Sequence, residues 1–274
     1  MPSQLTKTLI ATLGLIFSLP TFADLVLTAP PRETSVQGQE YYGPIAEYLT
    51  KKTGEKIVYK YPGSWEQYAA DMRNDKYDIV FDGPHFAAWR IKHLQHKPLV
   101  KLRGNLKFLV VANAEARDID NLDHLVSKKT CGIASPNLSM LTYLAQFADK
   151  PQAPSVLEIT GGMPAVYKAF KAGKCDAMVL RDSFYKNKIS AKDKEDLKIV
   201  YSSKPLPNQT ITVSARVGKK TQKIIGSSLL EVQGARSAKK VLYRFSRKRP
   251  TFTRASANSY LGVEALLEGR LAGW

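Results

Sequence analysis

The motifs that carry most catalytic chemistry are absent from this 274-residue chain. It contains no nucleophile elbow, no HExxH, no Walker-type phosphate loop, no GxGxxG and no CxxC pattern. His93 and His96 stand three residues apart on a predicted helix, but no other metal ligands lie near them in the sequence. We therefore expect a protein that is not an enzyme and that uses no cofactor and no metal.

Long hydrophobic runs are also absent, because no segment after residue 23 is apolar enough to cross a bilayer. The first 23 residues combine Lys7, an apolar run over 9–19 and small residues up to Ala23. This pattern predicts a secretory signal peptide that is cleaved after about Ala23. The residue directly after Ala23 is Asp24 and not a cysteine, so we expect no lipid anchor. The mature chain is expected to be soluble and, in a Gram-negative source, periplasmic.

Acidic residues are few, with 24 against 41 lysines and arginines. Removing Lys7 with the signal peptide leaves 40 basic residues and a formal charge of +16. Such a charge attracts anions and speeds their association. The densest basic stretch, 239–249, lacks an interleaved aromatic ladder on which bases could stack, so we expect an exposed helix face and no nucleic-acid partner.

The most informative stretch runs from Lys76 to Arg90. The short apolar run 79–81 predicts a strand that is buried on both faces. Asp82-Gly83-Pro84 ends it, and a helix is predicted over 85–94. The strand thus brings an acid, a glycine turn and a histidine to one edge of a sheet, where ligands of open α/β folds bind.

Two similar units follow one another in the chain. Strand, helix, strand, helix and strand are predicted over residues 25–81 and again over 131–180. In the second unit, Ser135 is expected to cap a helix that has Pro136 at its first position. We therefore predict an α/β protein of two doubly wound lobes joined by two hinge segments. The predicted division is a signal peptide over 1–23, lobe 1 over 24–105 and 210–274, and lobe 2 over 106–209.

The two cysteines, Cys131 and Cys175, each open a strand of the second unit. In the 2-1-3 strand order of doubly wound sheets these strands are neighbours. An even pair of cysteines in an oxidising compartment favours one disulfide.

Several short motifs together resemble one protein family. They are Pro31-Arg32-Glu33, Tyr42 to Leu49, Thr53-Gly54, Tyr77 to Val80, Gly83-Pro84, Ala172 to Ala177 and Pro205 to Asn208. In this order they resemble the periplasmic substrate-binding proteins of phosphate, phosphite and phosphonate ABC transporters. The resemblance implies a type II periplasmic-binding-protein fold, a small anionic ligand and a permease partner in the inner membrane. We expect the protein to be a monomer.

In the family, a turn rich in serine and threonine at a helix N-terminus holds the anion. The resemblance maps this turn to Ser135-Pro136-Asn137-Leu138-Ser139. No threonine stands between these serines, and Met163 follows Gly161-Gly162 where many members have a histidine. Backbone N–H groups and hydroxyls at a helix N-terminus suit a tetrahedral oxyanion. Ser135 could equally act only as a cap.

Asp82 and His85 form an unusual pair beside an anion. Asp82 could accept a hydrogen bond from a protonated oxyanion, bind a ligand ammonium, or only cap the following helix. His85, at a helix N-terminus, is expected to be neutral and to donate to the anion. Arg32 and Arg181, at strand ends, could bind the anion in a bidentate manner or lie on the surface.

Aromatic and hydroxyl side chains follow the second strand. Tyr61 or Trp65 could cover an organic substituent or belong to the core. The candidate ligand-binding residues are Arg32, Tyr61, Ser64, Asp82, Gly83, Pro84, His85, Ser135, Asn137, Leu138, Ser139, Arg181 and Asp182.

The sequence therefore favours a solute-binding protein that captures phosphonate, phosphite or phosphate by hinge closure and delivers it to a permease. Two alternatives stay open. One is a receptor that signals to a membrane kinase or cyclase, and the other is a binding protein for a sulfonate or another anion.

Overall fold

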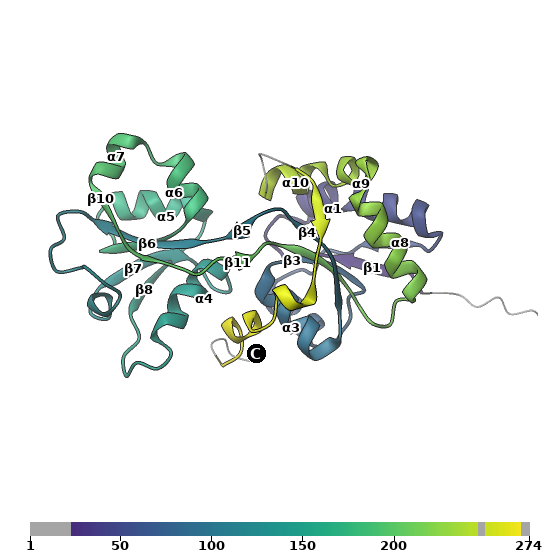
Figure 1. The fold of residues 1–274 in the computed structure, drawn as a ribbon, viewed down its shortest axis with the longest axis horizontal. Helices are drawn as coiled ribbons and strands as arrows, with labels where there is room; N and C mark the ends of the chain where they lie inside the picture. The colour runs from purple at the N-terminus through teal and green to yellow at the C-terminus, as the bar shows by residue number, and fades with distance from the viewer. Residues whose placement is uncertain (1–22, 246–249, 270–274) are drawn as a thin grey trace, which may run out of the picture.

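The computed structural model describes residues 23–245 and 250–269, so the expected signal peptide lies almost wholly outside the described residues. These residues form two lobes that lie side by side and are joined by a pair of extended segments (Figure 1). Among the described residues, no helix has the length and apolar character that crossing a membrane requires.

The first lobe is built on a six-stranded sheet with the order β13-β4-β12-β3-β1-β2. Its strands are β1 Leu25–Thr28, β2 Ile57–Tyr59, β3 Ile79–Asp82, β4 Lys97–Leu102, β12 Thr210–Val213 and β13 Phe252–Arg254. β1 pairs in parallel with β2 and β3, whereas β12 is antiparallel to both β3 and β4. The chain that returns from the second lobe therefore completes the first sheet between β3 and β4.

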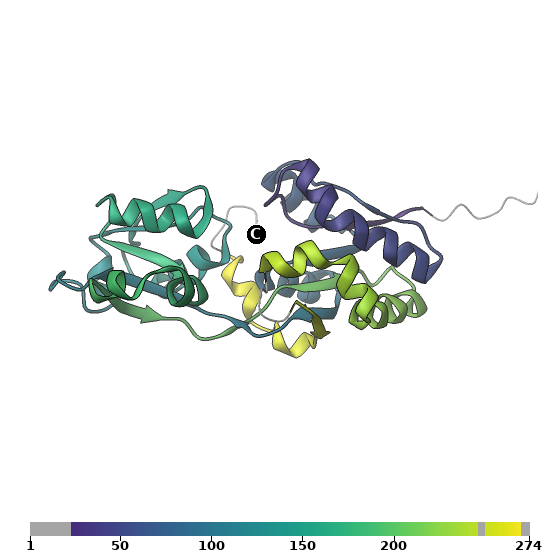
Figure 2. The ribbon, with the colours of Figure 1, turned by 90° about the horizontal axis from the view of Figure 1, so that it is seen from above.

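Helices cover both faces of this sheet. They are α1 Ser35–Thr53, α2 Trp65–Arg73, α3 Pro84–Leu94, α8 Lys219–Leu230, α9 Val232–Ser237 and α10 Lys239–Phe245. α1 lies with α8, α9 and α10 on one face, and α3 lies on the other (Figures 1 and 2). α1 begins at a capping box between Thr34 and Gln37 and ends at Gly54, whose φ of 77° suits glycine.

The second lobe has a five-stranded sheet with the order β10-β6-β9-β7-β8. Its strands are β6 Phe108–Asn113, β7 Lys129–Ile133, β8 Ser155–Ile159, β9 Ala177–Arg181 and β10 Leu197–Ser202. Its helical segments are η1 Asp123–Leu125, α4 Leu138–Leu144, η2 Ala145–Phe147, α5 Gly162–Lys171, α6 Asp182–Lys188 and α7 Ala191–Glu195. Figure 1 shows α4 on one side of this sheet and α5 with α6 on the other, so each face carries its own apolar core.

A disulfide joins Cys131 on β7 to Cys175, two residues before β9. β7 and β9 are parallel neighbours, and the Cα atoms of the two cysteines are 5.8 Å apart. The bridge closes a loop over a sequence separation of 44 residues. In the chain-entropy model, a loop of this length stabilises the fold by about 4 kcal/mol.

Two short strands form the connection between the lobes. β5 Asn105–Leu106 pairs antiparallel with β11 Leu206–Pro207. The first sheet takes its strands from residues 25–102 and 210–254, and the second takes them from 108–202. This sheet membership supports our proposal that the lobes divide at 105/106 and 209/210.

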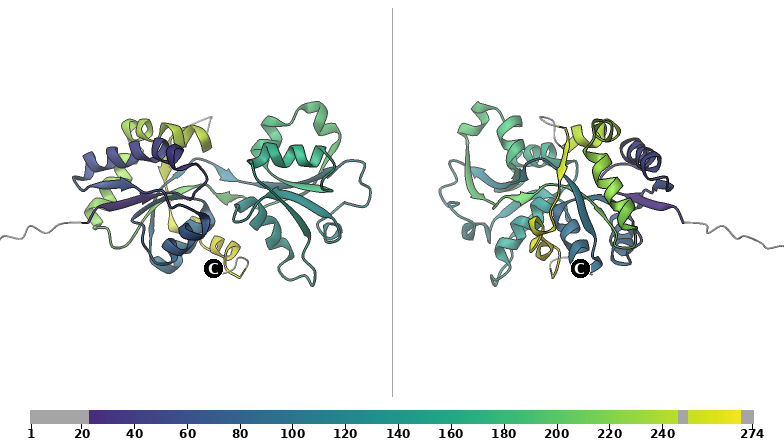
Figure 3. Two further views of the ribbon diagram at one scale, coloured as in Figure 1. Left: turned by 180° about the vertical axis from the view of Figure 1, so that it is seen from behind. Right: turned by 45° about the vertical axis from the view of Figure 1, so that its right-hand side comes forward.

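One local expectation was wrong. Helix α4 begins at Leu138, so Pro136 is not its first residue, and the N-cap is Asn137, whose side chain accepts from Ser139 N at 3.0 Å. An asparagine caps a helix as well as a serine does, and the sequence offered both. The C-terminal stretch packs inward, since Tyr260 and Leu267 are fully buried. Figure 3 shows this segment, with η3 Ala257–Ser259 and η4 Val263–Leu266, beside α3 where the lobes meet.

Candidate functional site

The carboxylate of Asp82 lies at the end of the buried strand β3 and is 0% exposed. One oxygen, Oδ1, accepts from Gly83 N at 2.6 Å and from Arg32 Nη2 at 3.3 Å. The other, Oδ2, accepts from Arg90 Nη2 at 2.6 Å and from the hydroxyl of Tyr68. The expectation that Asp82 could cap the helix does not hold, because the N-cap of α3 is Gly83 and no side chain bonds there.

Arg90 is the main ionic partner of Asp82, and the sequence analysis did not identify it. Its side chain is 1% exposed, and it also donates to Tyr68 at 3.0 Å and to Thr212 at 3.4 Å. Burial raises the pKa of Tyr68 well above 10, so its hydroxyl keeps its proton and donates. A signal was available, since Arg90 stands about one helical turn after the apolar Phe86 in the helix predicted over 85–94. A buried arginine requires an acidic partner.

His85 connects the two lobes. Its Nε2 atom is 3.1 Å from the backbone oxygen of Pro136, in the loop before α4. The ring is 2% exposed, and burial lowers the pKa of His85 to about 4. The expectation of a neutral histidine agrees with this pKa, although the cause is burial. The carboxyl ends of β3 and β7 therefore meet at His85 and Pro136.

Arg32 follows β1 and lies beside the end of β3. Its Nη2 contacts Asp82, and its guanidinium carbon lies 5.9 Å from the ring centre of Phe245. Its Nη1 atom is buried and has no hydrogen-bond partner in the described part of the chain. Because Asp82 is shared with Arg90, the side chains of Arg32, Asp82 and Arg90 together carry a net positive charge. We call Arg32, Asp82, Gly83, His85 and Pro136 the junction cluster.

The loop before α4 uses much of its own hydrogen-bonding capacity. The Ser139 hydroxyl is buried and donates to Asn137 Oδ1 at 2.7 Å. The backbone N–H of Ser135 donates to Glu158 at 2.9 Å, and Leu138 is 7% exposed. Ser135 does not cap α4. Glu158, at the end of β8, was not anticipated, and it takes one N–H group that the sequence analysis had assigned to the anion.

Arg181 ends β9 and is the N-cap residue of α6. Its Nε is buried and has no hydrogen-bond partner among residues 23–245 and 250–269. Burial lowers the pKa of Arg181. Arginine side chains do not lose their proton in proteins, so the group remains charged. Its neighbour Asp182 forms a 3.1 Å ion pair with Lys186 on the same helix.

The residues that follow β2 have structural roles in this arrangement. Ser64 is exposed and caps α2, accepting from Gln67 N at 3.2 Å. The hydroxyl of Tyr61 donates to Glu33 O at 3.2 Å, next to Arg32. Trp65 stacks on Phe86 with ring centres 6.1 Å apart. Within the described part of the chain, no observed contact brings Ser64, Arg181 or Asp182 to the junction cluster.

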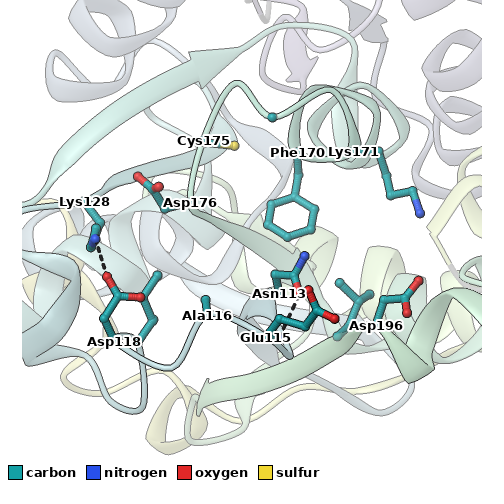
Figure 4. Close-up of a pocket in the computed structure, with 13 residues that line it drawn as sticks. Asn113, Glu115, Ala116, Asp118, Lys128, Phe170, Lys171, Cys175, Asp176 and Asp196 are labelled. Carbon is teal, nitrogen blue, oxygen red and sulfur yellow. Dashed lines mark hydrogen bonds and ion pairs between the residues drawn. The ribbon is translucent and has the colours of Figure 1, made fainter.

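A cavity of about 450 Å³ lies elsewhere in the second lobe (Figure 4). It is bordered by Asn113 at the end of β6, Lys128 before β7 and Asp176 before β9. It therefore lies at the amino ends of β7 and β9, opposite the edge that carries Arg181. Four of its lining residues are acidic: Glu115, Asp118, Asp176 and Asp196. Such a lining does not suit an anion.

Metal binding finds no support in the described residues, where no group of three or more histidine, cysteine or acidic side chains converges. His93 contacts Glu268 at 2.6 Å, and the buried His96 contacts Asp75 at 2.9 Å. The junction cluster instead offers guanidinium donors and a neutral imidazole, which are groups that bind oxyanions.

The family model described as "ABC transporter, phosphonate, periplasmic substrate-binding protein" matches residues 27–260. No curated protein matches the sequence. Among solved structures, PhnD1 from Prochlorococcus marinus in complex with methylphosphonate is similar, with a TM-score of 0.62 and 16% identity over 88% of this chain and 96% of that one.

Two further structures share the fold. XAC2383 from Xanthomonas citri, bound to ATP, has a TM-score of 0.69 and 16% identity over 88% of this chain and 94% of that one. A binding protein component of an ABC phosphonate transporter from Pseudomonas aeruginosa has a TM-score of 0.59 and 15% identity over 89% and 85% of the two chains. The fold of this chain is thus that of a type II periplasmic binding protein, as the sequence analysis predicted.

Proposed function

Since this chain belongs to the family of periplasmic substrate-binding proteins of phosphonate ABC transporters and is a solute-binding component of such a system, we propose that its ligand is a small phosphorus oxyanion. Phosphonate, phosphite and phosphate are the candidates. The ligand binds where the carboxyl ends of the strands of the two lobes meet, and closure of the lobes about β5 and β11 encloses it.

The observation that carries this proposal is a buried guanidinium nitrogen, Arg32 Nη1, that has no hydrogen-bond partner among the described residues. A buried donor that is left unmet destabilises a fold by about 1–3 kcal/mol, and by more when it is charged. An oxyanion oxygen meets this donor and offsets the extra positive charge. Arg181 Nε, at the carboxyl end of β9, is a second buried donor of the same kind.

Asp82 acts within this proposal as a support and does not contact the ligand. Its two oxygens accept from Arg32, Arg90, Tyr68 and the backbone of Gly83. It thereby fixes the Arg32 side chain, while Arg90 neutralises the acid.

Family membership favours delivery to a permease over signalling to a membrane kinase or cyclase. We also propose export by a signal peptide ending near Ala23 and action as a monomer.

Ligand-dependent thermal stabilisation of the purified protein tests the proposal. The panel contains methylphosphonate, phosphite, phosphate, ATP, methanesulfonate and arginine. A ligand at 100 times its Kd adds about 2.7 kcal/mol to the free energy of unfolding, which corresponds to roughly 5–10 °C in Tm for a protein of this size. We expect this shift with at least one of the first three compounds.

A pair of variants then tests the site. Arg32→Gln should weaken the binding of that ligand by tenfold or more, since it removes the charged donor. Arg236→Gln is the matched control, because Arg236 is exposed on α9 and forms no ion pair with the described residues. A Tm response confined to methanesulfonate or arginine would overturn the ligand class, and equal losses in the two variants would remove Arg32 from the site.

A further inference from the structure

The proton on the neutral imidazole of His85 has a defined position. Nε2 faces the backbone oxygen of Pro136 at 3.1 Å, and a carbonyl oxygen can only accept a hydrogen bond. Nε2 therefore carries the proton, and Nδ1 presents a lone pair. The ring is 2% exposed, and its pKa of about 4, which is lowered chiefly by burial, keeps it neutral near pH 7.

Nδ1 of His85 is buried and has no hydrogen-bond partner in the described residues, as is also true of Arg32 Nη1. Both side chains border Gly83. A Cβ atom built on Gly83 would lie 3.0 Å from His85 Nδ1 and 3.5 Å from Arg32 Nη2. A strong donor on Arg32 and a strong acceptor on His85 thus belong to side chains that both border Gly83, and each needs a partner of the opposite kind.

One chemical group supplies both partners, namely an oxyanion that still carries a proton. We propose that His85 Nδ1 accepts a hydrogen bond from the hydroxyl of a singly protonated phosphorus oxyanion, while Arg32 binds an anionic oxygen of the same ligand. This inference rests on the function proposed above. An oxyanion without a proton, such as a sulfonate, leaves Nδ1 unmet and places a charged oxygen against its lone pair. A ligand ammonium would also donate to Nδ1, but the neighbouring Arg32 repels it.

The charged groups that face His85 are Arg32 after β1, Asp82 on β3 and Arg90 on α3, and the second lobe contributes the Pro136 carbonyl. Both arginines stay charged across the physiological range. Phosphate monoesters lose their second proton with a pKa of about 6, and alkylphosphonates lose it at a somewhat higher pH. Between pH 5.5 and 9 the ligand therefore changes its charge, whereas His85 stays neutral.

Calorimetric titration of the full-length wild-type protein with methylphosphonate between pH 5.5 and 9 tests this inference. If only the monoanion binds, the Kd rises tenfold for each pH unit above the second pKa of the ligand. Binding at pH 8.5, measured in buffers of different ionisation enthalpy, should take up close to one proton. Methanesulfonate, which has a similar shape but no proton, should bind at least 100-fold more weakly at every pH.

Two substitutions locate the acceptor. In His85→Asn the side-chain oxygen takes the place of Nδ1, so the rise of Kd with pH should persist. Since asparagine does not titrate, this persistence would also show that the proton is on the ligand. In His85→Gln the amide reaches toward Pro136, and the acceptor is lost, so the rise should flatten and the affinity for the monoanion should fall at least tenfold.

The two proposals fail in different ways. If phosphite, phosphate and methylphosphonate all fail to bind at any pH, the proposed function is wrong. If they bind with a Kd that is unchanged or falls as the pH rises, only the role of His85 is wrong. The same holds if His85→Gln keeps the wild-type pH dependence. The wild-type titration decides the question even if a variant fails to fold.

Discussion

The substitution Asp82→Asn tests the central structural assignment, which is that this acid holds the first lobe together and does not bind the ligand. Asparagine keeps the size and shape of the side chain but removes its charge. It leaves the guanidinium of Arg90, 1% exposed and 2.6 Å from the carboxylate in the wild type, without its ionic partner. Arg32 loses its 3.3 Å contact at the same time.

The expected effect is large because the pair is fully buried. Removing one member of a buried ion pair reduces the free energy of unfolding by about 3–5 kcal/mol, since the remaining charge stays desolvated. For a protein of this size that loss lowers Tm by roughly 6–20 °C. The Lys240–Glu40 pair provides the comparison, with side chains 56% and 53% exposed and a distance of 2.8 Å. Glu40→Gln should change stability by no more than about 1 kcal/mol.

Urea unfolding followed by circular dichroism at pH 7.5 measures both variants against the wild type. A double variant, Asp82→Asn with Arg90→Met, also removes the buried, unpaired guanidinium and should therefore recover part of the lost free energy of unfolding. The assignment is refuted if Asp82→Asn destabilises the protein no more than Glu40→Gln does. Arg90→Met is also measured alone, and the assignment is refuted if the loss in the double variant equals the sum of the losses in Asp82→Asn and Arg90→Met.

Two further predictions follow from the junction cluster and from the buried histidines. Gly83→Ala places a Cβ atom 2.8 Å from His85 Cε1, so it should displace the ring, weaken ligand binding about tenfold and reduce stability by about 1–3 kcal/mol. Gly218→Ala is the control in calorimetry and urea unfolding, because Gly218, like Gly83, is an N-cap glycine with a negative φ. A Cβ atom on Gly218 would have Thr221 Oγ1 as its nearest neighbour, at 3.9 Å. Burial lowers the pKa of both His85 and His96 to about 4, so the folded state binds fewer protons than the unfolded state, whose histidines titrate near 6.5. Stability should therefore fall as the pH drops from about 6.5 toward 4, by about 2 kcal/mol per histidine at pH 5, and His96→Asn should reduce the difference between urea unfolding at pH 7.5 and pH 5.

Local patterns in the sequence predicted the parallel core of each lobe. The apolar run 79–81 is a buried strand, and Gly83-Pro84 opens the helix that follows. These features depend on residues that are close in the chain. The antiparallel strand β4 and its partners were not predicted, because Lys97–Leu102 has mixed polarity and pairs with residues more than 100 positions away.

Contacts between distant segments were the part of the site that the sequence did not determine. His85 and Pro136 are 51 residues apart, and only the folded arrangement brings them together. Helix capping near α4 involved two suitable residues, Ser135 and Asn137, and local propensity did not separate them. The partners of Asp82 were not predicted, because the sequence analysis considered only a protonated oxyanion, a ligand ammonium or the helix N-terminus, whereas the structure pairs this acid with Arg90 and Arg32.

The choice among those partners decides the sign of the charge that a ligand meets. With Asp82 facing the ligand, the acid would repel an anion and favour a cation. In this structure Arg90 approaches to 2.6 Å and Arg32 only to 3.3 Å, so the more buried arginine neutralises the acid and the other keeps a donor to spare. A residue that the ligand need not contact thus makes the end of β3 suitable for an oxyanion. Asp82→Asn therefore probes the proposed ligand class as well as the stability of the first lobe.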